Sequence, residues 1–250
     1  MRFSVYFSLV VPFVSCFLAS TVHSRGIPNN LKKFYELQKG SCNNVIAKVG
    51  DFVYCGDCDN AIFLKGSRRL YDNMDIDCDG LNRLGGKCSN DPSGQGETSF
   101  KGLVKKYSRG AVSDLDASKV PYVVFGNEGG RQTFDPRQYG MKPLSVMAVV
   151  CGNNLVYGIW GDTNGGVDTG EASISLAELC FPGEGISGDN GHDRRDVLYI
   201  GFTSTRDADA EKYNWFVFSF VAVGKWPMSK NAWDFERSIS AIGDKLVAQL

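Results

Sequence analysis

Short apolar runs separated by glycine and asparagine recur along most of the chain. The runs rich in β-branched and aromatic residues are Ala61–Leu64, Tyr122–Phe125, Ser145–Val150, Leu155–Trp160, Val197–Phe202 and Trp215–Val223. Runs of this length between turn residues are typical of buried strands. Gly152, Asn153 and Asn154 separate two of them and predict a tight hairpin. The pattern therefore predicts a single domain that is mainly β and barrel-like.

Two segments have apolar residues at helical spacing. Leu31–Gln38 predicts a short helix, and Asp234–Leu250 predicts a longer C-terminal one with the apolar stripe Ile239, Ile242, Leu246 and Val247. A stripe of this kind usually packs against a core. A third segment, 171–179, has apolar residues at every second position over its first half, which favours a strand leading into a turn.

The first 24 residues have the pattern of a secretory signal peptide. Arg2 is followed by the uncharged, mostly apolar stretch Val5–Ala19, and Val22 and Ser24 occupy the positions that a signal peptidase reads. The stretch is too short to span a membrane, and no later one is long enough. We expect residues 25–250 to form one secreted, extracellular domain.

The chain as a whole is nearly neutral, but its charged residues are unevenly distributed along the sequence. There are 27 Lys and Arg against 28 Asp and Glu, so the basic face that nucleic-acid binding requires is not indicated. Residues 51–80 nevertheless concentrate acidic side chains: Asp51, Asp57, Asp59, Asp72, Asp75, Asp77 and Asp79. An acidic cleft would attract a cationic ligand, although a solvated acidic surface explains the same composition.

Cysteine usage fits secretion. Of the eight cysteines, Cys16 lies in the signal segment, and disulfides are the default for the other seven in an oxidising compartment. Their odd number leaves one without an intramolecular partner. We expect the pairs Cys42–Cys55, Cys78–Cys88 and Cys151–Cys180, with Cys58 free.

Several catalytic classes are excluded by residue content. His192 is the one histidine after the signal segment, so zinc sites that need two histidines are excluded. Neither a nucleophile elbow nor a phosphate or dinucleotide loop occurs. His192 is interpreted as a structural hydrogen-bonding residue, and no cofactor is predicted.

Carboxylic residues remain, and Asp162 and Glu171 form the candidate catalytic pair, although the pattern Asp162–Gly165 is also typical of an ordinary turn. Asp162 follows an apolar run directly, and Glu171 follows the glycine-rich loop 165–170 and begins another run. Such a loop can fold back so that two strand ends face one cleft, and glycoside hydrolysis needs two carboxyl groups across a cleft. Trp160 could stack on a sugar and lower the local dielectric, which favours Asp162 as the general acid.

Six segments in order resemble the fungal chitosanases of glycoside hydrolase family 75: Tyr54–Asp57, Met74–Gly80, Pro121–Gly126, Val156–Gly165, Gly170–Ala177 and Asp196–Ile200. The resemblance implies endo-hydrolysis of β-1,4-linked glucosamine in chitosan with inversion, and a fold related to double-psi β-barrels. It places the family's catalytic Asp and Glu at Asp162 and Glu171.

The expected substrate-binding residues are Asp57, Asp75, Asp77, Trp160 and Asn164. A monomer is expected, with no metal and no membrane association. The alternative is a non-catalytic carbohydrate-binding or wall-loosening barrel protein, and retention of both Asp162 and Glu171 argues against it.

Asp75, Asp77, Asp79 and Gly80 match the first half of an EF-hand calcium loop. The twelfth position is Gly86, which has no carboxylate, and no helices are predicted around the motif. Three interpretations therefore stay open, namely a calcium site, a lining for the cationic-substrate cleft, and a turn network.

Overall fold

The structure is a computed structural model that describes residues 25–93, 96–131, 133–203 and 239–250. The signal segment 1–24 and the predicted strand Trp215–Val223 lie outside the described residues. Within the described ranges, no helix has the length and apolar character needed to cross a membrane.

Strands dominate the described chain, and four helical segments of at least seven residues accompany them. The strands are β1 Arg25–Gly26, β2 Val45–Val49, β3 Phe52–Cys58, β4 Ala61–Lys65, β5 Asp72–Asp77, β6 Tyr122–Asn127, β7 Val146–Cys151, β8 Asn154–Asn164, β9 Glu171–Ser173 and β10 His192–Phe202. The helices are α1 Asn29–Gln38, α2 Lys101–Tyr107, α3 Ile174–Cys180 and an unlabelled C-terminal helix over residues 239–247, with short 3₁₀ turns at Gly86–Cys88 and Pro136–Tyr139.

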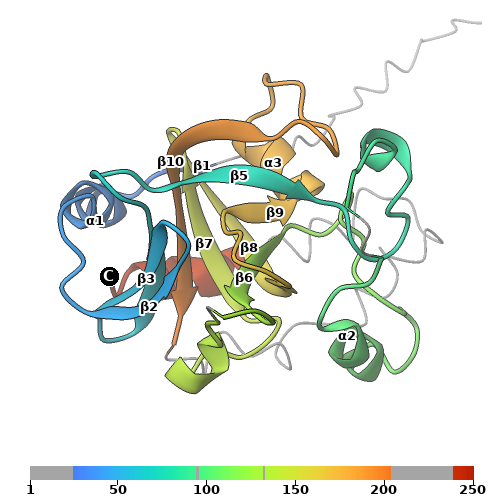
Figure 1. The fold of residues 1–250 in the computed structure, drawn as a ribbon, viewed down its shortest axis with the longest axis horizontal. Coiled ribbons are helices and arrows are strands. Elements are labelled where there is room, and N and C mark those ends of the chain that lie inside the picture. Colours follow the sequence, from blue (N-terminus) through green and yellow to red (C-terminus); the bar gives the residue numbers. More distant parts are fainter. Residues whose placement is uncertain (1–24, 94–95, 132, 204–238) are drawn as a thin grey trace, which may run out of the picture.

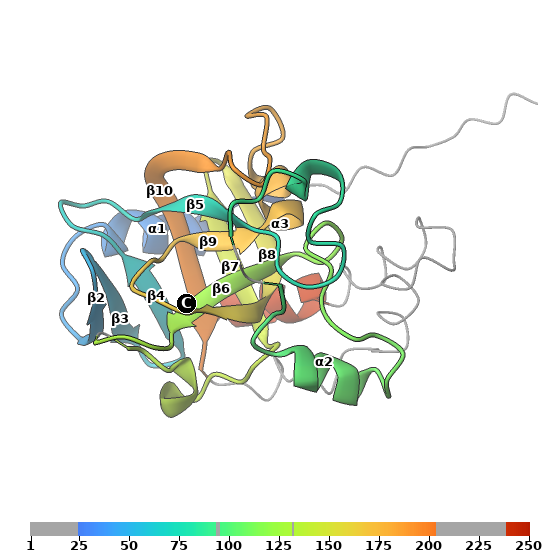
Figure 2. The ribbon, with the colours of Figure 1, turned by 45° about the vertical axis from the view of Figure 1, so that its right-hand side comes forward.

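Six of the strands close into a ring. Going round it, β8 pairs with β6, β6 with β9, β9 with β5, β5 with β10, β10 with β7, and β7 again with β8. β4, β3 and β2 extend the sheet outward from β10. Figures 1 and 2 show the ring with α1 and α2 on opposite sides of it. The predicted barrel-like β domain is thereby confirmed, and its relation to double-psi barrels stays a prediction.

The core explains why these segments are strands. All residues of β4, β6 and β7 are buried, so an unbroken apolar run is stable there. α1 packs against the sheet through Phe34, whose ring meets Phe63 edge-on. The C-terminal helix buries Ile239, Leu246 and Val247, as its predicted stripe requires, and Tyr157 on β8 donates a hydrogen bond to Asp244.

The local predictions that fall within the described residues were confirmed with two exceptions, and residues 234–238 of the predicted C-terminal helix lie outside that part of the chain. Gly152 and Asn153 form the predicted hairpin turn, because Cys151 pairs with Asn154. β8, however, does not end at Trp160 but runs on to Asn164. Residues 174–180 are also a helix and not an extension of the strand, because the Ser173 hydroxyl accepts a hydrogen bond from the Leu176 N–H and caps it.

The predicted disulfides are all present. They join Cys42 to Cys55, Cys78 to Cys88 and Cys151 to Cys180, and Cys58 is the free thiol among the cysteines that the structure describes. Two of them brace the ends of ring strands, since Cys78 follows β5 directly and Cys151 ends β7. Cross-links of this kind typically stabilise a fold by about 2–4 kcal/mol each.

Candidate active site

The two predicted catalytic residues lie in one row across three neighbouring strands. Val124 on β6 is in register with Asp162 on β8 and with Glu171 on β9. Residues in register on neighbouring strands project from the same face of a sheet. The side chains of Asp162 and Glu171 therefore open onto one face, and both line a single cavity together with Val124.

A register shift in β8 turns Asp162 toward this face. Trp160 pairs with Val123 and Asp162 with the very next residue, Val124, so Gly161 is an extra residue in β8. Such a bulge reverses the alternation of side chains. Glycine fits the bulge because a Cβ at this position would come within 2.5 Å of the Tyr122 Cβ.

The same bulge leaves Trp160 in the core. Its side chain is 1 % exposed, its ring meets Phe100 edge-on at 4.9 Å, and its indole N–H donates to the Asp162 carbonyl at 2.9 Å. The expectation that Trp160 stacks on a sugar is therefore wrong, because no ligand can reach a ring buried to this extent. Trp160 instead supports the backbone that carries Asp162.

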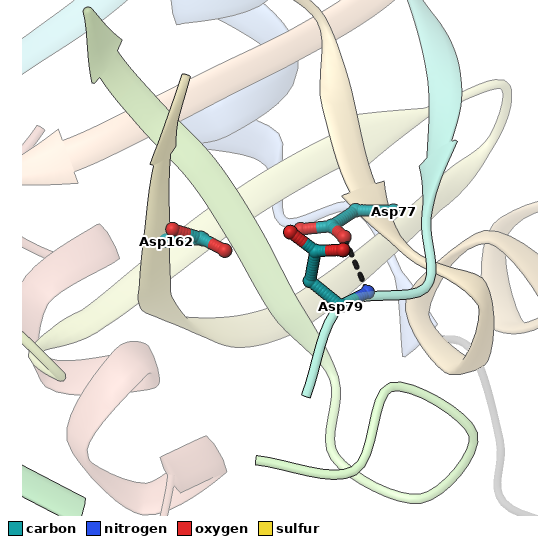
Figure 3. A group of neighbouring side chains, drawn as sticks. All are labelled: Asp77, Asp79 and Asp162. Carbon is teal, nitrogen blue, oxygen red and sulfur yellow. Dashed lines mark hydrogen bonds between the residues drawn. The ribbon is translucent and has the colours of Figure 1, made fainter. Parts of the chain in front are cut away.

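Two further carboxyl groups complete a cluster. Asp77, the last residue of β5, and Asp79 approach Asp162 so that one carboxyl oxygen from each residue lies within 4.8 Å of the others. Figure 3 shows the three carboxyl groups turned toward one another. All three residues are buried, and Asp77 accepts a hydrogen bond of 2.7 Å from the Asp79 N–H. The cluster gives the site an excess of negative charge in a poorly solvated position.

Asp162 and Glu171 differ in their hydrogen bonds. Oδ1 of Asp162 accepts from the backbone N–H groups of Ser99 at 2.8 Å and Thr163 at 2.7 Å, which favours the charged carboxylate. Glu171 accepts one longer hydrogen bond, 3.1 Å, from the side-chain amide of Asn164. Asn164, predicted as a binding residue, thus lies in the site and contacts a catalytic candidate.

Burial is the main cause of raised pKa values throughout the cluster. It raises the pKa of Asp162 to about 6, and the Ser99 and Thr163 donors oppose the rise. It raises the pKa of Glu171 to about 8, helped by the nearby charges of Asp162, Asp75 and Asp79. The pKa of Asp79 rises to about 7, and that of Asp77 is raised by burial and then by the charge of Glu171. Glu171 therefore holds its proton to higher pH than Asp162.

The raised pKa values predict how the free energy of unfolding depends on pH. The folded cluster binds protons more tightly than the unfolded chain, where these groups titrate near 3.8 and 4.5. The free energy of unfolding should therefore fall as pH rises from about 4 to about 8. Asp79→Asn should lessen the fall, and Asp51→Asn, at an exposed position, should leave it unchanged. Urea unfolding at several pH values measures the slopes, and equal slopes for wild type and Asp79→Asn would contradict the prediction.

Asn127 holds the first half of the loop that links the two catalytic candidates. Its side-chain amide donates to the carbonyls of Gly166 at 2.9 Å and Asp168 at 2.8 Å, and its Oδ1 accepts from the Tyr54 hydroxyl at 2.9 Å. Asn127 is 1 % exposed. A buried side chain on β6 therefore ties this half of the loop to the barrel.

Asp72 holds the second half of that loop. The Thr169 hydroxyl donates to Asp72 at 2.7 Å, and the Gly170 carbonyl accepts from the Asp75 N–H at 2.7 Å. Gly170 has φ +76°, and a Cβ there would meet the Asp72 carboxyl carbon at 2.6 Å. The residue before Glu171 is thus fixed by a contact that only glycine allows.

Asp75, Asp57 and His192 do not line the cavity. Asp75 pairs with Glu171 and accepts a hydrogen bond from Asn73, but it does not line the cavity. Asp57 lies on β3, where it accepts backbone N–H groups of Asn43 and Asn44, and it is also absent from the cavity lining. His192 is buried between Glu184 and Asp196, which confirms its structural role.

The EF-hand interpretation is wrong. Asp75 and Asp77 both lie within the strand β5, and Gly80 makes a bridge to Asp116. The segment is therefore extended and cannot wrap around an ion as a calcium loop does. Only Asp77 and Asp79 of the motif reach a common site, and there they join Asp162.

Sequence reasoning missed Asp79, Ser99 and Thr163 as members of the site. Asp79 was visible in the spacing of the three aspartates. Ser99 contributes through its backbone N–H, which leaves no signal in the sequence.

Comparison with known proteins gives a consistent result. Residues 74–249 match the family described as fungal chitosanase of glycosyl hydrolase group 75. An endo-chitosanase of Aspergillus fumigatus is 58 % identical over 233 residues, which cover 90 % of this chain and 91 % of that protein. An endo-chitosanase B of Aspergillus oryzae (strain ATCC 42149 / RIB 40) is 53 % identical over 235 residues, which cover 90 % of this chain and 91 % of that protein. An endo-chitosanase of the same strain is 49 % identical over 252 residues, which cover 95 % of this chain and 97 % of that protein.

Proposed function

Because the chain belongs to the fungal chitosanases of glycosyl hydrolase group 75, we propose that it hydrolyses β-1,4 linkages between glucosamine units of chitosan, with Asp162 and Glu171 as its catalytic groups. One observation supports the pair above all others. The two residues are in register with the same residue of β6, one on each side of it.

This placement suits an inverting mechanism. Strands lie about 4.8 Å apart, so the Cα atoms of residues two strands apart are separated by roughly 9.6 Å. Inverting glycosidases have carboxyl groups roughly 6.5–9.5 Å apart, which leaves room for a water molecule beside the sugar, whereas retaining enzymes need about 5–5.5 Å. Two residues with a whole strand between them are compatible with the wider spacing of an inverting pair, and we propose single displacement.

We assign Glu171 as the general acid and Asp162 as the general base. Glu171 has the higher pKa and few hydrogen-bond donors, so it is protonated when the substrate binds. Asp162 accepts two backbone N–H groups that stabilise its anion. This assignment reverses the preference drawn from sequence, which rested on Trp160 and on a strand end that β8 does not have.

The proposed reaction is a single displacement at C1 of the sugar. Glu171 gives its proton to the glycosidic oxygen as the C1–O bond breaks, and that oxygen keeps the bonding electron pair. Water forms the new bond to C1 from the opposite face while Asp162 takes its proton. The product is an α-anomer, and Asp162 and Glu171 exchange a proton with solvent before the next turnover.

The acidic surroundings suit a polycationic substrate. Asp77 and Asp79 line the cavity, and Asp75 lies beside Glu171 on the neighbouring strand. Glucosamine units carry ammonium groups that such carboxylates attract, whereas neutral glucans gain nothing from them. A non-catalytic carbohydrate-binding barrel would not need two carboxyl groups with raised pKa values, so that alternative is not favoured.

The first test is substrate choice. We expect the purified protein to release reducing ends from highly deacetylated chitosan and to leave cellulose almost untouched. KM for chitosan should rise with added salt, because charges beyond roughly 8 Å are screened at physiological ionic strength. A reducing-end assay measures both, and equal turnover of the two polymers would refute the proposal.

We further propose that the protein is secreted as one monomeric domain after loss of residues 1–24. The signal-like N-terminal pattern supports this, and so do the three disulfides, which are typical of oxidising compartments. N-terminal sequencing of protein recovered from culture medium tests the cleavage site, and light scattering tests the monomer.

A further inference from the structure

A small cavity lies between Asp162 on one side and Asp77 and Asp79 on the other, with Thr163 also in its lining. Its volume is about 20 Å³. A cavity needs about 10–15 Å³ to hold one water molecule. The space therefore has room for at least one water molecule.

Two residues of this lining each have a buried side-chain oxygen that lacks a protein partner. Within the described residues, Asp79 Oδ1 and Thr163 Oγ1 make no hydrogen bond, although the two residues are 3 % and 6 % exposed. Buried polar atoms in proteins are nearly always hydrogen-bonded. These two oxygens therefore mark a place where a small polar molecule completes the structure.

The spacing of the carboxyl groups fits a bridging water. Oxygens of Asp77, Asp79 and Asp162 lie within 4.8 Å of one another. Two hydrogen bonds of about 2.8 Å that meet at a tetrahedral angle have ends roughly 4.6 Å apart. One water can thus reach Asp162 and Asp79 at the same time, while Asp162 Oδ1 stays fixed by Ser99 and Thr163.

We propose that Thr163 and Asp79 hold the water molecule that attacks the sugar, with Asp162 as its base. The inference rests on the proposed function. The Thr163 hydroxyl donates to one lone pair of the water, Asp79 binds one of its hydrogens, and Asp162 takes the other hydrogen. The remaining lone pair faces C1 of the glucosamine. Thr163 and Asp79 are positioning residues for the nucleophile.

The matched pair Thr163→Val and Thr163→Ser tests this role. Valine keeps the shape of threonine without its hydroxyl, and serine keeps the hydroxyl. We expect Thr163→Val to lower kcat on chitosan oligosaccharides about ten- to hundredfold, as misplacement of a reactant does. KM and Tm should change little, and Thr163→Ser should restore most of kcat. Asp79→Asn should also lower kcat and should shift the pH–rate profile.

The outcomes separate this inference from the proposed function. If Asp162→Asn is inactive while Thr163→Val and Asp79→Asn keep wild-type kcat, the water site is refuted and the catalytic pair stands. If Asp162→Asn itself keeps wild-type kcat, the proposed function fails. A rise in Tm with millimolar calcium chloride that Asp79→Asn abolishes would assign the cavity to a cation and overturn the inference. Thr163→Ala replaces the valine variant if the latter does not fold.

Discussion

Glu171→Gln and Asp162→Asn should each lower kcat on chitosan by at least about a hundredfold, because general acid–base catalysis contributes on the order of 10²–10⁴-fold per group. Both changes keep side-chain shape and remove a group that gives or takes a proton. Both residues line the same cavity and are largely buried, so the loss should not reflect a changed surface. Binding of chitosan and the thermal unfolding midpoint should stay close to wild type.

The two variants should differ when the leaving group changes. An oligosaccharide with an aryl leaving group of low pKa needs no proton at its glycosidic oxygen. Glu171→Gln should therefore recover much of its activity on that substrate if Glu171 is the acid, whereas Asp162→Asn should not. The reverse pattern would exchange the two roles and leave the pair itself intact.

Asp75→Asn and Asp57→Asn are suitable controls. Asp75 lies beside Glu171 outside the cavity, so its loss should raise KM for chitosan and leave kcat mostly unchanged, the sign of lost uniform binding. Asp57 is engaged with backbone N–H groups of residues 43 and 44, so its change should not reduce kcat. Wild-type kcat in Glu171→Gln or Asp162→Asn would refute the catalytic pair.

The strands were visible in the sequence, but their closure into a ring was not. Each apolar run predicts a strand because burial on both faces requires one. The ring depends on pairings such as Asp75 with Glu171 and Leu198 with Val150, which join residues about a hundred or fifty positions apart. No local pattern records such a pairing, so the sequence predicted a barrel-like β domain but not which strands pair in it.

The motif led to the proposed catalytic pair, but the surroundings of that pair could not be predicted. The Gly161 bulge decides that Trp160 faces the core and Asp162 the cavity, and the sequence shows only an apolar run followed by Gly-Asp. Thr163 looked like an ordinary turn residue, and Asp79 belonged to an apparent calcium motif. Their roles follow from burial and from missing partners, which are properties of the folded structure.

Asn127→Ala should impair both stability and catalysis. The change removes three hydrogen bonds, namely those to the Gly166 and Asp168 carbonyls and the one from the buried Tyr54 hydroxyl, whose O–H is then left without an acceptor. The unsatisfied Tyr54 donor costs about 1–3 kcal/mol and each lost hydrogen bond to the loop about 0.5–1.5 kcal/mol, so we expect the free energy of unfolding to fall by about 2–4 kcal/mol. Urea denaturation followed by tryptophan fluorescence measures this loss.

The catalytic effect should follow from the loop between the two carboxyl groups. With Asn127 removed, the loop 165–170 loses both hydrogen bonds to β6 and keeps those to Asn164, Asp72 and Asp75. A displacement of about 1 Å at a reacting group can cost on the order of 10² in rate, so kcat should fall at least about tenfold. Tyr54→Phe is the matched control, because it removes one hydroxyl and leaves both amide contacts to the loop. It should lower stability less and leave kcat close to wild type. If Asn127→Ala lost stability but kept full kcat, Glu171 would be positioned by β9 and its pairing with β5 and β6 alone, and the loop would serve only to connect the strands.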